Sequence, residues 1–85
     1  DDYYLDLYPV GEMIFIRNLD KPGLIGNLGT LMGKNGINIA AMALGRNQPG
    51  DKAISVWSVD NQVSPAIQDK IKQLENILTV KIIRT

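Results

Sequence analysis

The stretch NLDKPGLIGNLGTLMGKNGINIA, residues 18–40, decides the fold class of this chain. Within it, Asp20 is the expected helix N-cap, Pro22 lies in the expected first turn, and Gly36 is expected to end the helix in the left-handed conformation. The interval between them predicts an amphipathic helix over 23–34, because its apolar residues recur at helical spacing. These residues are Leu24, Ile25, Leu28, Leu31 and Met32.

Apolar runs on both sides of this helix predict four strands, over 13–17, 37–45, 53–59 and 77–84. Ser64 and Pro65 predict the start of a second helix, as cap and first helical residue. Its buried stripe is Ile67, Ile71 and Leu74. The order is strand, helix, strand, strand, helix, strand. It predicts an α+β fold of the ferredoxin-like βαββαβ type, with a four-stranded antiparallel sheet and two helices on one face.

The composition excludes several classes of site. The 85 residues include no Cys and no His, which excludes a thiol nucleophile, a Ser-His-Asp triad and a zinc finger. Nine basic residues balance nine acidic ones, so nothing in the charge favours nucleic acid or an anionic membrane as partner. We expect no catalytic residue, metal or cofactor in this domain, and the absence of Cys agrees with a cytoplasmic location.

The chain is short, and it begins with Asp1 rather than Met. A domain of this size buries only ~60–65% of its unfolded surface, so a partner chain or a larger parent would help to stabilise it. Residues 1–11, DDYYLDLYPVG, are interpreted as the tail of a preceding domain or a linker, and a flexible arm is the alternative. Residues 12–85 are the predicted domain.

Two features indicate contact with a second copy of the chain. Three glycines, at 26, 29 and 33, leave a groove on the first helix that fits either a subunit contact or tight packing on the domain's own sheet. In the expected strand order the second strand is an edge, and no charge occurs between Lys34 and Arg46 to protect it. We predict a symmetric dimer in which the second strands meet. Its interface comprises Asn38, Ala40, Met42, Leu44, Gly26 and Gly29.

The loop NLDKPG, residues 18–23, is the candidate ligand site. The helix start at Pro22, Gly23 and Leu24 is expected to offer unpaired amides and the positive dipole end to a carboxylate. Asp20 is suited to accept from an ammonium group, and Asn18 and Asn38 add amide side chains. These groups fit a small amino acid. The alternative is structural, with Asp20 as a plain cap and Asn38 as a turn residue.

These residues resemble the ACT domains, a family that binds amino acids and regulates metabolic enzymes. The resemblance covers residues 12–85 and is strongest toward the C-terminal serine-binding domains of D-3-phosphoglycerate dehydrogenases. The motifs that carry it are N-x-D-K-P-G-L-I-G at 18–26, G-x-L-M-G-K-N-G-I-N-I-A at 29–40, M-A-L-G-R at 42–46 and A-I-S-V-W-S-V-D at 53–60. The opening segment, residues 1–11, also resembles the end of the domain that precedes the ACT domain in the longer dehydrogenases.

The resemblance implies that L-serine binds between two side-by-side domains, to Asn18 and Asp20 of one chain and to Asn38 of the other. It implies feedback inhibition of a parent NAD-dependent dehydrogenase of serine biosynthesis, with the NAD held outside this domain. Some relatives carry His and Asn at the positions of Asn18 and Asp20, and this sequence departs from them there.

Other assignments stay open at this point. Within the family, the chain could be the ACT domain of an iron–sulfur L-serine dehydratase β subunit or a sensor of another small amino acid. An RNA-binding domain of the same fold needs stacked aromatics on a basic face, whereas Phe15 and Trp57 lie in a neutral chain. A hydrolase of acylphosphatase type needs an anion-binding loop, in which Asp20 would repel the anion.

Overall fold

The computed structural model describes residues 11–46 and 51–84, and all structural statements below concern these residues. The predicted tail, residues 1–11, lies outside them except for Gly11. The strands are β1 (Glu12–Leu19), β2 (Ile39–Arg46), β3 (Lys52–Val59) and β4 (Ile77–Arg84), and the helices are α1 (Leu24–Lys34) and α2 (Pro65–Lys72). The predicted ferredoxin-like order is confirmed, with boundaries within two residues of those expected.

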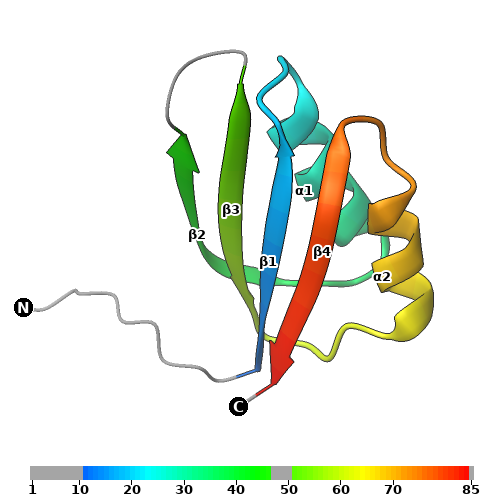
Figure 1. Cartoon of the computed structure of the whole chain (residues 1–85). Coiled ribbons are helices and arrows are strands. Elements are labelled where there is room, and N and C mark those ends of the chain that lie inside the picture. The colour runs from blue at the N-terminus through cyan, green and yellow to red at the C-terminus, as the bar shows by residue number, and fades with distance from the viewer. Residues whose placement is uncertain (1–10, 47–50, 85) are drawn as a thin grey trace, which may run out of the picture.

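The four strands form one antiparallel sheet in the order β2-β3-β1-β4. Both helices lie behind one face of it (Figure 1). The second and fourth strands are therefore the edges, and the nearly uninterrupted apolar strand β1 is central, as the sequence predicts.

The core lies between the helices and alternate residues of the two central strands. Along β1, the even-numbered residues Ile14 and Ile16 are fully buried, and Trp57 and Val59 of β3 belong to the same buried cluster. The predicted stripe of α1 completes this cluster, since Leu24, Leu28 and Met32 are buried and Ile25 and Leu31 pack against it. The same pattern carries on to Asn18, so the last inward-facing residue of β1 is polar.

Two predicted helix boundaries are confirmed, the end of α1 at Gly36 and the start of α2 at Ser64 and Pro65. Gly36 has φ +74°, and the amides of Gly36 and Ile37 donate to the carbonyls of Gly33 and Met32, which is the Schellman ending. At the second helix, the Ser64 side chain accepts from the amide of Ile67, 3.2 Å away, and Pro65 is the first helical residue.

The predicted N-cap of α1 is wrong. The cap residue is Gly23, at φ +84° and ψ −10°, and no side chain bonds to the helix start. Lys21, Pro22, Gly23 and Leu24 instead form a turn closed by the Leu24 amide on the Lys21 carbonyl, 3.3 Å away. Proline followed by glycine in the left-handed region is the type II turn. This turn delays the helix, so Asp20 stays outside it and its amide donates to the Asp51 carbonyl at 2.6 Å.

The edge strand β2 leaves apolar side chains exposed. Met42 and Leu44 lie opposite the inward-facing Trp57 and Ser55, so they are on the helix side of the sheet, yet they are 40% and 45% exposed. In Figure 1, β2 lies beyond the area that the helices cover. A bulge at Ala40 leaves the remainder of β2 regularly paired with β3.

Candidate functional site

Asn18 places an acceptor without a hydrogen-bond partner near the C-terminal end of β1. Its side chain is buried, with 2% of the residue exposed, and its Nδ2 donates to the Leu19 carbonyl at 2.9 Å. That bond fixes the amide, because a carbonyl can only accept. The other amide atom, Oδ1, is buried and has no hydrogen-bond partner among the described residues. A buried acceptor without a partner costs about 1–3 kcal/mol, so a bound donor would relieve it.

The start of α1 follows Asn18 after a short loop. Helix geometry leaves its first amides without partners inside the helix. Of the amides expected to be unpaired at Pro22, Gly23 and Leu24, two need correction, because proline has no N–H and the Leu24 amide is used in the type II turn. The amides of Ile25 and Gly26 are the next in the first turn. They bring the positive end of an 11-residue helix toward this loop.

Asn38 lies at the opposite end of the sheet from this loop. In one row across the sheet, Asn18 of β1 pairs with Ala53 of β3, and Ala53 pairs with Arg46, the last residue of β2. Asn38 directly precedes Ile39, the first residue of β2, and its carbonyl accepts from the amide of Asp60, the residue after β3. At ~3.3 Å per residue, Asn38 is about 23 Å from that row. A single chain does not bring Asn38 together with Asn18 and Asp20.

Asn38 is held by two side chains that the sequence analysis missed. Its Nδ2 donates to the Asp60 carboxylate, and its backbone amide donates to Asn61 Oδ1 at 2.7 Å. Its Oδ1 accepts no hydrogen bond from any described residue. The contacts span 22 and 23 residues of sequence, so no local pattern could reveal them. The only available signal was the polar pair directly after a buried strand.

The glycines of α1 do not pack on the domain's own sheet. A Cβ built at Gly26, Gly29 or Gly33 would meet no atom within 4 Å in the described structure. At 100° per residue they lie together on the side of the helix away from Leu24 and Leu28. This surface is open, so the alternative of tight internal packing is wrong.

Other sites receive no support from the described residues. They contain no group of three or more metal-ligating side chains of the His, Cys, Asp or Glu type. None of their helices is long and apolar enough to cross a membrane.

The antiparallel sheet, with two helices on one face and a polar loop at the end of a central strand, defines a small ferredoxin-like α+β domain. The ACT domain family matches residues 13–76, and the chain belongs to that family.

Relatives and solved structures agree with this assignment. The D-3-phosphoglycerate dehydrogenase of Methanocaldococcus jannaschii is 36% identical over 83 residues, which is 98% of this chain and 16% of that protein. The enzyme of the same name from Archaeoglobus fulgidus is 38% identical over 80 residues, which is 92% of this chain and 15% of that protein. The chain thus spans about one-sixth of the length of these relatives.

Among solved structures, the crystal structure of the ACT domain from the GTP pyrophosphokinase of Chlorobium tepidum has a TM-score of 0.67 at 17% identity. It covers 85% of this chain and 95% of that domain. The small subunit of acetolactate synthase from Thermotoga maritima has a TM-score of 0.63 at 17% identity, over 84% of this chain and 45% of that subunit. At these identities the likeness concerns the fold.

Proposed function

We propose that this chain is an amino-acid-sensing regulatory domain that binds L-serine between two copies of itself. The observation that carries the proposal is the buried, unpartnered Oδ1 of Asn18 at the end of β1. The ligand needs a donor at this point, and an ammonium group supplies three. The negative charge of Asp20, two residues along, adds attraction for the same group.

The second half of the site comes from a partner subunit. If two β2 strands pair antiparallel about a two-fold axis, the first residues of one β2 lie beside the last residues of the other. Asn38 of the partner subunit then falls in the row that contains Asn18, three strand spacings or about 14 Å away. Two asparagine side chains and a small amino acid fill that width. The exposed Met42 and Leu44, together with Gly26 and Gly29 of α1, would become buried there.

The hydrogen bonds within the chain suggest how the ligand lies. Asn18 and Asn38 both use their NH₂ groups within the protein and keep Oδ1 for other donors. Two carbonyl oxygens and a carboxylate fit the ammonium end of an amino acid. The amides at the start of α1 fit its carboxylate end. A small side chain such as the hydroxymethyl group of serine suits the short gap between the two chains.

The regulatory role rests on the relatives. They are named D-3-phosphoglycerate dehydrogenase, and this chain matches a small part of each. We infer a parent enzyme of that activity, which uses NAD and is inhibited by L-serine. A ligand held across two chains favours the conformation in which they are side by side, and that preference shifts the parent's equilibrium.

Calorimetry with L-serine up to millimolar concentration on the full chain tests the proposal. We expect one site per chain in the wild type, and loss of at least tenfold in affinity for Asn38→Ala. Gln62→Ala is the matched control, since it removes an exposed amide from the segment next to Asn38 and is expected to bind normally. Absence of heat from a wild-type dimer would refute serine sensing. A larger heat from another small amino acid would reassign the ligand, and inhibition assays on the parent enzyme test the regulatory step.

A further inference from the structure

We propose that Asp60 is a positioning residue that fixes the orientation of the Asn38 amide and so makes the site selective for ligands with an ammonium group. The proposal rests on the proposed function, because it concerns the partner half of that site. In this proposal Asp60 acts through Asn38 and does not itself contact the ligand.

Three of the four polar groups of Asn38 are bonded to the two residues after β3. The Asn38 carbonyl accepts from the Asp60 amide at 3.0 Å, and the Asn38 amide donates to Asn61 Oδ1 at 2.7 Å. The side-chain Nδ2 donates to the Asp60 carboxylate. The backbone and the side chain of Asn38 are therefore both held, although the residue is exposed and precedes an edge strand.

The carboxylate decides which end of the Asn38 amide remains available. An ionised carboxylate has acceptors only, so it bonds the NH₂ group and turns Oδ1 away from itself. An asparagine or a serine at position 60 would tolerate either orientation of the Asn38 amide, because each has a donor and an acceptor. The bond to an ionised acceptor is also the stronger type, which favours a single orientation.

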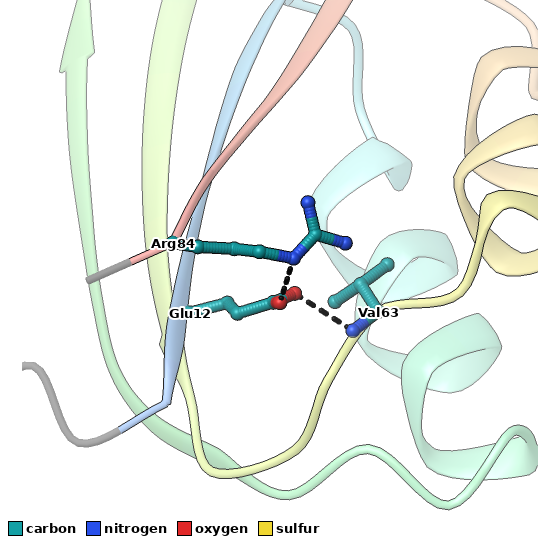
Figure 2. A network of polar contacts seen from close by, with 3 residues as sticks. All are labelled: Glu12, Val63 and Arg84. Carbon is teal, nitrogen blue, oxygen red and sulfur yellow. Dashed lines mark hydrogen bonds and ion pairs between the residues drawn. The ribbon is translucent and has the colours of Figure 1, made fainter.

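Asp60 is itself held in place from the other end of its loop. The Val63 amide, three residues along, donates to Oε1 of the buried Glu12 at 2.8 Å, and Oε2 of Glu12 pairs with Arg84. Figure 2 shows this network, in which Glu12 of β1 lies between Val63 of the loop and Arg84 of β4. The segment from Asp60 to Val63 is thus attached at its start to Asn38, just before β2, and at its end to Glu12 of β1.

The consequence is a polarity at the ligand site. An ammonium group can only donate, so it requires the Oδ1 orientation of Asn38. A hydroxyl group donates or accepts and fits both orientations. Glycerate, in which a hydroxyl replaces the ammonium group of serine, therefore reports binding that does not depend on the orientation of the amide.

The experiment compares calorimetric affinities for L-serine and for the glycerate of the same handedness on the full chain. The variants are Asp60→Asn, the swap Asn38→Asp with Asp60→Asn, and Asp69→Asn. Asp69 lies exposed on α2, so its variant controls for the loss of one negative charge. Circular dichroism and light scattering establish that each variant is folded and dimeric before titration.

For Asp60→Asn we expect a loss of about tenfold in affinity for L-serine and a change below about twofold for glycerate. The swap should recover L-serine binding, because Asp at 38 has only acceptors and Asn at 60 supplies the donor. Asp69→Asn should match the wild type. Equal losses for both ligands in Asp60→Asn, or a swap that recovers nothing, would overturn the positioning role while leaving serine sensing intact. Absence of L-serine binding to the wild type would overturn both.

Discussion

Arg84 Nε lies 2.6 Å from Oε2 of the buried Glu12, so an ion pair joins the last residue of β4 to the first residue of β1. The two residues are also direct neighbours in the sheet register. Because Oε1 of Glu12 accepts from the Val63 amide, one carboxylate connects two strands and the loop before α2 (Figure 2).

Glu12→Ala is expected to lower the free energy of unfolding by about 1–3 kcal/mol, because it leaves the buried Val63 amide without an acceptor. Urea denaturation followed by circular dichroism measures the change. Glu75→Ala, at an exposed position before β4, should stay within about 0.5 kcal/mol of the wild type. Equal effects of the two substitutions would contradict the structural role of Glu12.

Gly23→Ala is expected to destabilise the fold by about 1–2 kcal/mol, because the residue has φ +84° in the type II turn. A Cβ there meets no atom within 4 Å, so the cost comes from the backbone alone. Gly33→Ala has equally open surroundings but lies inside α1, where alanine is favoured by about 1 kcal/mol. The same substitution should thus have opposite signs at the two positions in thermal unfolding.

Gly29→Leu is expected to weaken the dimer at least tenfold while leaving the chain folded. A Cβ at position 29 would meet no atom within 4 Å in the described part of the chain, so we expect the larger side chain to clash mainly with a partner subunit. Thr30→Leu, one residue along on an exposed position of α1, is the control for added apolar bulk. Analytical ultracentrifugation measures both dissociation constants. Unchanged dimerisation in Gly29→Leu would remove α1 from the interface.

Leu44→Lys tests the β2 edge in the same way. A charge on the helix side of this edge should separate the subunits, because it would be buried by an adjoining strand. Ile54→Lys is closely matched, since Ile54 is 44% exposed against 45% for Leu44 but lies on the central strand β3. We expect a monomer from the first variant and a dimer from the second in light scattering. If both variants were dimers, the edge-to-edge arrangement would be excluded.

The elements whose ends have local signals were predictable from the sequence. Ser64 and Pro65, Gly36, and the stripe from Leu24 to Met32 each report a property of a few adjacent residues, and the structure confirms them. The start of α1 was also encoded locally, in the pair Pro22 and Gly23. Asp20 is a residue type that caps helices, but the type II turn at Pro22 and Gly23 places the start of the helix at Leu24 instead.

The candidate site was predictable only in part. Asn18 and Asn38 could be named, but the spare acceptor on each depends on which neighbour takes the NH₂ group. For Asn38 that neighbour is Asp60, which comes close only when β3 has paired with β2. Likewise, the burial of Glu12 depends on a loop about 50 residues away. Contacts of this kind are set by the tertiary fold, not by local propensity.

Because Asn18 and Asn38 lie at opposite ends of one sheet, a site shared between two chains predicts complementation between two defective variants. Chains with Asn18→Ala and chains with Asn38→Ala would each form dimers with two defective sites. If each site is shared between two chains as proposed, both lesions fall in one site of a mixed dimer, and the other site combines the intact Asn18 of one subunit with the intact Asn38 of its partner. Mixing two inactive populations should therefore create L-serine binding, up to one ligand per mixed dimer. A site contained within a single chain would show no such complementation.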